Sequence, residues 1–158
     1  MHLAAKAGIR PSIINPTAYF NVNIQGTLNV LDFMLSNDVR KIVFASSSSV
    51  YGDNSISPYK ETGNTDFPIS PYAFTKKSCE LLLYNYFNLY QLSTISLRLF
   101  TVFGPRQRPD LAIHKFFNAV LKEMPIVIYG DGSNSRDYTY IDDTVDGVIK
   151  ALDLFNAP

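Results

Sequence analysis

The stretch "RKIVFASSSSVYG" (40–52) decides the fold class of this chain. Its first half is a short apolar run that ends in small residues, which predicts a buried strand over 40–47. The serines at 46–49 then place four hydroxyl groups where this strand ends. In open α/β sheets, ligands bind at the carboxyl ends of the strands. On composition alone, however, a run of serines is more typical of a turn or a linker.

Helical patterns flank this strand on both sides. Apolar residues recur at helical spacing after Pro16, and the Ser70-Pro71 pair is a typical start for a second, long helix. The predicted helices cover 17–37, 71–90, 111–123 and 140–155, the predicted strands cover 40–47, 94–100 and 125–130, and a loop covers 53–69. Because strands and helices alternate along the chain, the predicted fold class is parallel α/β.

Composition argues against several classes of function. The 158 residues carry 14 basic and 14 acidic side chains, so no charge imbalance indicates a nucleic-acid or anionic-membrane partner. Cys79 is the one cysteine in the sequence, which excludes an internal disulfide and a cysteine-ligated zinc site, and we predict no metal site. No apolar run approaches the roughly 20 residues that span a bilayer. We therefore expect a soluble, cytoplasmic protein without a membrane partner.

The segment "SPYAFTKK" (70–77) places Tyr72 four residues before Lys76. On a helix, side chains at this spacing lie on one face. A nearby ammonium lowers the pKa of a phenol by favouring the phenolate, and such a tyrosine can act as general base on an alcohol. Taken alone, the same spacing is more typical of a packed aromatic residue beside a solvated charge.

Six segments in a fixed order resemble the NAD-dependent epimerase/dehydratase family, a part of the extended short-chain dehydrogenase/reductases. They are "HLAA", "NIQGTLNVL", "SSSSVYG", "SPYAFTKK", "LRLFTVFGPRQRPD" and "SRDYTYIDD", and they span nearly the whole chain. The resemblance implies a Rossmann-like fold, NAD as cofactor and a UDP-sugar as substrate. It also divides the chain into 1–103, the middle and C-terminal part of the NAD-binding domain, and 104–158, part of a substrate-binding region.

The resemblance assigns roles to individual residues. As catalytic groups, Tyr72 would take a proton from a sugar hydroxyl, Lys76 would hold the nicotinamide ribose, and Ser47 would hydrogen-bond the sugar oxygen. The residues implied at the cofactor are Leu3, Ala4, Ala5, Asn23, Ser46, Tyr72, Lys76 and Phe100. The residues implied at the substrate are Ser47, Thr101, Arg108 and Arg136. A guanidinium suits phosphate and carboxylate oxygens, although Arg136 is also placed to pair with Asp137.

The two residues that follow the catalytic hydroxyl indicate which reaction of the family fits this chain. Dehydratases of the family carry an Asp-Glu pair there, and decarboxylating relatives often carry a glutamate, whereas this chain has Ser48 and Ser49. Serine is not an acid of comparable strength near neutral pH, so epimerisation fits best. The stretch 100–116 resembles UDP-glucuronate 4-epimerases, in which Arg106 and Arg108 would meet the uronate carboxylate. The main competing substrate pair is UDP-galactose and UDP-glucose, and an equal alternative is that both arginines face solvent on a loop.

The glycine-rich phosphate loop of the family, G-x-x-G-x-x-G, is not found in this sequence. We therefore expect the chain to be the middle of a longer enzyme, with parts of the fold beyond both ends. The expected protein partner is a second copy, bound through the helices at 17–37 and 71–91. The alternative from another class is a noncatalytic remnant, an interaction module that has lost cofactor binding.

Overall fold

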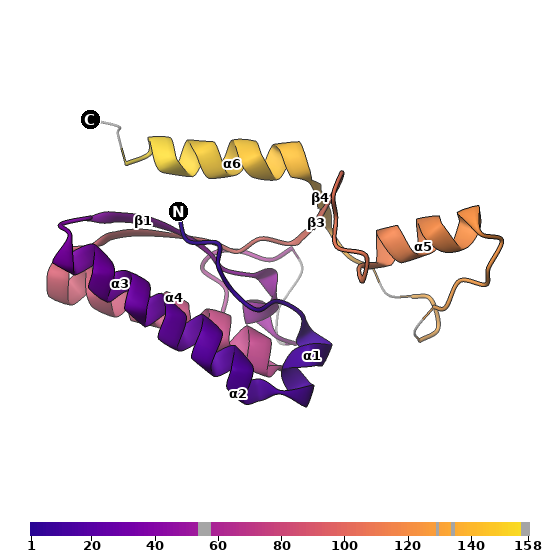
Figure 1. Ribbon diagram of the computed structural model, residues 1–158, viewed down its shortest axis with the longest axis horizontal. Helices are drawn as coiled ribbons and strands as arrows, with labels where there is room; N and C mark the ends of the chain where they lie inside the picture. The colour runs from indigo at the N-terminus through magenta and orange to yellow at the C-terminus, as the bar shows by residue number, and fades with distance from the viewer. Residues whose placement is uncertain (54–57, 129, 134, 156–158) are drawn as a thin grey trace. The chain divides into compact units, whose positions relative to one another are not determined.

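A computed structural model describes residues 1–158 except 54–57, 129, 134 and 156–158. In chain order, its elements are α1 (Ile9–Ile14), α2 (Pro16–Tyr19), η1 (Phe20–Gln25), α3 (Gly26–Ser36), β1 (Lys41–Ala45), η2 (Ser48–Tyr51), α4 (Pro71–Tyr90), β2 (Ser93–Leu97), β3 (Thr101–Phe103), α5 (Ala112–Leu121), β4 (Tyr138–Tyr140) and α6 (Ile141–Asp153) (Figure 1). The chain divides into two compact units, Met1–Leu99 with the segment from Val148 onward, and Phe100–Gly147. The predicted boundary after residue 103 stays a prediction.

The first unit is built on parallel strand pairing. β1 pairs with β2 in parallel, from Lys41 opposite Ser93 to Ala45 opposite Leu97. On its other edge, β1 pairs in parallel with His2, whose N–H donates to the Val43 carbonyl at 2.8 Å. β1 is thus flanked on both edges, and its side chains from residue 42 onward are buried. The predicted parallel α/β fold class is confirmed.

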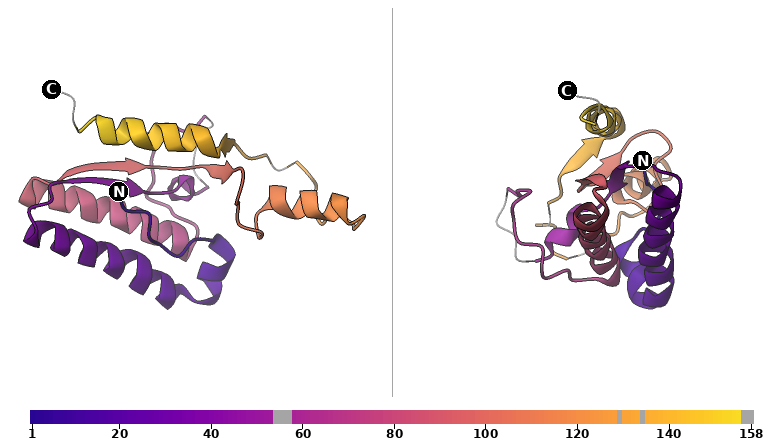
Figure 2. Two further views of the ribbon diagram at one scale, coloured as in Figure 1. Left: turned by 45° about the horizontal axis from the view of Figure 1, so that its top comes forward. Right: turned by 90° about the vertical axis from the view of Figure 1, so that its left-hand side faces the viewer.

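Helices α3 and α4 lie side by side against one face of this sheet, as both views of Figure 2 show. The α4 helix begins at Pro71, where the Ser70 side chain accepts a hydrogen bond from the Ala73 amide, and it ends at Tyr90 as predicted. The buried core between these helices and the sheet consists of Leu31, Met34, Ile42, Phe44, Cys79, Leu83, Tyr86 and Leu92. Within the described residues, none of the helices combines the length and the apolar character that a membrane span requires.

The helix predicted over 17–37 is interrupted by one unusual turn. Its central residues, Phe20–Gln25, form a π-helix between α2 and α3. Asn23 lies in this turn with 1% of its surface exposed, and its amide is hydrogen-bonded to other parts of the chain. Single π-helical turns inside α-helices often occur where a side chain has a special task.

The prediction of a strand over 125–130 is wrong for the part of it that the structure describes. Residues 125–128 form no strand, and the side chains of Ile126, Val127 and Ile128 are exposed. Within the second unit, β3 pairs in parallel with β4 instead. An apolar run forms a strand only when a neighbouring strand satisfies its backbone groups, and no described strand pairs with this one.

Candidate active site

The position of Tyr72 is set by the first turn of α4 and by the N-terminal helices. Its backbone N–H donates to the Ser12 hydroxyl at 3.1 Å, and Ser12 is fully buried. Its ring meets the Tyr19 ring edge-on, with 6.3 Å between the ring centroids. The Tyr72 side chain is half-buried. Tyr72 is thus held at its backbone by Ser12 and at its ring by Tyr19, while part of the residue stays exposed.

Lys76 follows one helical turn later and is buried, with 4% of its surface exposed. Its ammonium donates to the carbonyl of Ala45 at 2.7 Å and lies 4.8 Å from the centre of the Phe44 ring. Burial lowers the pKa of Lys76 below the ordinary value of 10.5. The cation is therefore not the solvated charge of an amphipathic helix, since it sits at the carboxyl end of β1.

Ser47 is the second residue after β1 and caps the short helix η2. Its hydroxyl oxygen accepts from the Ser49 amide at 3.2 Å and bonds the Ser49 hydroxyl at 2.9 Å. The next amide, that of Ser48, donates to the Leu99 carbonyl at 2.9 Å. The serine run is thus a hydrogen-bonded turn at the end of a buried strand, which places Ser47 and Lys76 at the same end of β1.

Ser46, for which a cofactor role stays a prediction, is hydrogen-bonded to a carboxylate of the protein. It is buried, and its hydroxyl donates to the Glu80 carboxylate at 2.5 Å. Glu80 is also held by Arg98, whose Nε and second terminal nitrogen lie 3.1 and 2.9 Å from the two carboxylate oxygens. Sequence analysis missed both residues. Glu80 does stand four residues after Lys76, so the spacing that linked Tyr72 to Lys76 could have pointed to it.

Asn23, predicted at the cofactor, has its amide hydrogen-bonded to the protein. The amide nitrogen donates to Thr75 at 2.9 Å and to the Lys6 carbonyl at 3.1 Å, while its oxygen accepts from the Lys6 amide at 2.7 Å. These bonds tie the segment after the His2 bridge to α4. In that segment, Leu3 and Ala4 are exposed and Ala5 is half-buried. A cofactor role for these four residues stays a prediction.

The remaining predicted residues belong to the second unit. Phe100 and Thr101 are half-buried, and Thr101 begins β3. Arg108 forms an exposed ion pair with Asp110, with 3.1 Å between its Nε and a carboxylate oxygen. Arg136 is exposed and donates to the Ser135 carbonyl at 2.7 Å, and among the described residues it forms no ion pair, with Asp137 or otherwise.

Lys77, the residue after Lys76, is not a fully solvated lysine. It is half-buried and donates to the hydroxyl of Thr65 at 2.5 Å, and Thr65 itself is buried. The segment before α4 is therefore fastened to the helix next to Lys76.

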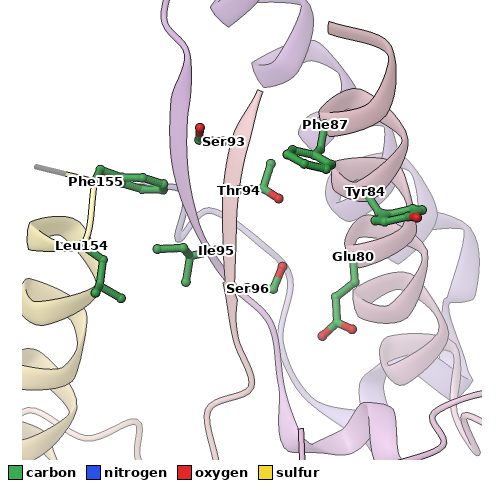
Figure 3. Close-up of a pocket in the computed structure, with 9 residues that line it drawn as sticks. All are labelled: Glu80, Tyr84, Phe87, Ser93, Thr94, Ile95, Ser96, Leu154 and Phe155. Carbon is green, nitrogen blue, oxygen red and sulfur yellow. The ribbon is translucent and has the colours of Figure 1, made fainter. Parts of the chain in front are cut away.

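A pocket of about 590 Å³ lies along β2 (Figure 3). Thr94 and Ser96 face α4 in it, whereas Ile95 points toward Leu154 and Phe155. The described residues that line the pocket are Glu80, Tyr84, Phe87, Ser93, Thr94, Ile95, Ser96, Leu154 and Phe155. Glu80 lines this pocket. The described lining residues do not include Tyr72, Lys76 or Ser47.

The model of the NAD dependent epimerase/dehydratase family matches residues 1–158. The chain belongs to this family. It is 49% identical over 152 residues to the UDP-glucuronate 4-epimerase of Thermodesulfobacterium geofontis, covering 96% of this chain and 47% of that protein. It is 48% identical to UDP-glucuronate 4-epimerase 5 of Arabidopsis thaliana, covering 97% of this chain and 36% of that protein. The family resemblance found in the sequence is confirmed.

Solved structures agree with this assignment. The UDP-glucuronic acid 4-epimerase of Bacillus cereus, solved with UDP-glucuronic acid and NAD, has a TM-score of 0.90 and 40% identity. That match covers 96% of this chain and 48% of the epimerase. The UDP-N-acetylglucosamine 4-epimerase of Methanobrevibacter ruminantium has a TM-score of 0.90 and 41% identity, covering 95% of this chain and 49% of that one. The chain therefore spans about half the length of these relatives.

Proposed function

We propose that this chain carries the catalytic part of a nucleotide-sugar 4-epimerase that interconverts UDP-glucuronate and UDP-galacturonate. The observation that carries the proposal is the buried Lys76 ammonium at the end of β1, one helical turn from Tyr72 and beside the Ser47 turn. Burying a cation is costly, and perturbed cations gather at functional sites. The similarity to UDP-glucuronate 4-epimerases supports the choice of substrate.

One feature of the site, the hydrogen-bonding capacity of Lys76, suits the binding of NAD. The Lys76 ammonium has three donors, and its described hydrogen bond uses one of them, to the Ala45 carbonyl. Two donors are then left for the hydroxyls of a ribose. When bound, NAD would accept a hydride from the sugar and later return it.

The chain's own residues would handle the proton. Tyr72 would take the proton of the sugar hydroxyl at C4 as general base, because the nearby Lys76 charge favours the phenolate form. Ser47, held by its bonds to Ser49, would donate to the same sugar oxygen. Ser48 and Ser49 offer no carboxyl group to expel a neighbouring hydroxyl, so dehydration is disfavoured.

The substrate contacts are proposed in the second unit. Thr101, on β3, would bind the sugar nucleotide, and Arg136 would bind its diphosphate through its guanidinium fork. Arg108 would meet the uronate carboxylate in place of its exposed partner Asp110. An exposed ion pair is worth about 0–1 kcal/mol, so such an exchange costs little.

The test is epimerisation of UDP-glucuronate by the purified protein with NAD, compared between the unsubstituted chain and Tyr72→Phe. We expect the substitution to lower kcat by roughly a thousandfold or more, since general base catalysis contributes about 10²–10⁴-fold. Tyr84→Phe is the matched control, because Tyr84 is on the same helix and 65% exposed. A protein that binds no NAD and converts no UDP-sugar would instead support the noncatalytic interaction module. Conversion of UDP-glucose but not UDP-glucuronate would replace the proposed substrate.

The proposed partner is a second copy of the chain, bound through α3 and α4. These helices expose large apolar side chains, among them Phe33 at 65%, Leu81 at 56% and Phe74 at 47%. Exposed apolar side chains in such number are typical of interaction surfaces. Sedimentation equilibrium would test this: a molar mass of twice the chain supports the pairing, and a monomer contradicts it. A cytoplasmic location stays a prediction from the sequence.

A further inference from the structure

The ion pair between Glu80 and Arg98 lies next to the proposed catalytic residues Tyr72, Lys76 and Ser47. The family resemblance assigned it no role. The Glu80 side chain is 9% exposed and the Arg98 side chain 20% exposed. Both carboxylate oxygens of Glu80 are bonded to the Arg98 guanidinium, and one of them also accepts from Ser46. The ion pair holds the pKa of Arg98 above its ordinary value. A carboxylate bound this way has a fixed orientation.

The same ion pair reaches both flanks of Ser47. On the N-terminal side, Glu80 fixes the hydroxyl of Ser46, the residue directly before it. On the C-terminal side, the Arg98 guanidinium lies 5.0 Å from the centre of the ring of Tyr51, the last residue of η2. Tyr51 is buried, so this end of the turn is also fixed. Ser47 therefore lies between Ser46 and Tyr51, whose side chains both contact this ion pair.

Arg98 also connects the Ser47 turn to residues of the segment that precedes α4. One of its terminal nitrogens donates to the Glu61 carbonyl at 3.1 Å, and Tyr51 stacks on Tyr59 with 4.8 Å between the ring centroids. Lys76 and Glu80, one turn apart on α4, meanwhile bond successive residues, the Ala45 carbonyl and the Ser46 hydroxyl. Two side chains of α4 thus hold the backbone at the point where it leaves β1.

We propose that Glu80 is a positioning residue: clamped by Arg98, its carboxylate fixes Ser46 and so aims the Ser47 hydroxyl at the oxygen on which Tyr72 acts. The inference rests on the proposed function, because it assigns Ser47 a task in catalysis. Glu80 touches no reacting atom. Its loss shifts the Ser47 hydroxyl, and a shift of about 1 Å in a catalytic group costs up to roughly a hundredfold in rate.

The test substitutes Glu80→Gln, which keeps the shape of the side chain but removes its charge and turns an amide NH₂ toward the Arg98 donors. Arg98→Lys is the second variant, since lysine keeps the charge and cannot form the two-pronged bond. The matched control is Asp38→Asn, which removes the Arg40–Asp38 ion pair, where the Asp38 side chain is 83% exposed. Two quantities are measured in the whole protein: the kinetic constants for UDP-glucuronate, and hydrogen exchange of the amides of residues 46–52.

We expect Glu80→Gln to lower kcat roughly ten- to hundredfold with KM changed less than about threefold, and Arg98→Lys to act in the same direction. Amides of residues 46–52 should exchange roughly ten times faster, while the control changes neither quantity. Lower stability with an unchanged kcat for the folded protein would overturn the proposal, because it would make the ion pair a purely stabilising one. If the unsubstituted protein has no epimerase activity, the proposed function fails. Exchange still decides the positioning: faster exchange confined to 46–52 supports it, and unchanged exchange overturns it.

Discussion

The ammonium of Lys76 donates a 2.7 Å hydrogen bond to the carbonyl of Ala45, the last residue of β1. This bond joins the second turn of α4 to the carboxyl end of β1, the strand of the first unit that is paired on both edges. It satisfies a strand-end carbonyl, and it holds a positive charge in a place where burial opposes charging. A single contact thus fixes the helix on the sheet and keeps a positive charge buried in the candidate site.

The first prediction concerns the pH dependence of stability. Burial lowers the pKa of Lys76 in the folded protein below the unfolded value of 10.5. Between these two pKa values the unfolded chain binds more protons, so stability rises with pH through that window. Relative to a Lys76→Met variant, the unsubstituted protein should therefore gain unfolding free energy as the pH approaches 10.5. Urea denaturation of both proteins at several pH values measures this gain, and parallel pH profiles would contradict it.

The second prediction separates structure from cofactor binding at Asn23. Asn23→Ala removes three hydrogen bonds of a residue that is 1% exposed, including the one that its amide donates to the hydroxyl of the buried Thr75. We expect a loss of about 2–4 kcal/mol of unfolding free energy without any cofactor present. Asn29→Ala is the control, since Asn29 is exposed on the same helical segment and should change stability by less than about 0.5 kcal/mol. Equal stability of the two variants would show that the buried amide has no structural task.

Local signals in the sequence were sufficient for the elements that carry the site. The apolar run at 40–47 predicted β1 because a strand of a parallel sheet is buried on both faces and so carries apolar side chains on both, as residues 42–45 do. The Ser-Pro pair predicted the start of α4 because each residue has a defined role at a helix N-terminus. Helix geometry then predicted that Tyr72 and Lys76, four residues apart on α4, lie on one face.

The environment of the site could not be predicted in the same way. Glu80 and Arg98 are far enough apart in the chain that no local pattern links them, and their pairing depends on how α4 packs on β2. The π-helical turn around Asn23 likewise arises from tertiary hydrogen bonds to Lys6 and Thr75 rather than from propensity. The apolar run 125–130 predicted a strand that residues 125–128 do not form, because strand formation depends on a partner strand as much as on composition.

The third prediction contrasts two glycines. Gly52, which ends η2, has φ 61° and ψ −147°, a backbone conformation that is essentially restricted to glycine, and a Cβ there would overlap the Phe67 carbonyl oxygen. Gly26, at the start of α3, has ordinary helical angles, and a Cβ there meets nothing within 4 Å. Gly52→Ala should therefore cost roughly 3 kcal/mol or more, through strain and through displacement of the loop. Gly26→Ala should add about 1 kcal/mol, because alanine is the better helix former. Thermal unfolding of both variants measures the difference. A Gly52→Ala protein as stable as the unsubstituted one would contradict the tight approach of the Phe67 backbone to the serine turn, and with it the fixed geometry on which the proposed site depends.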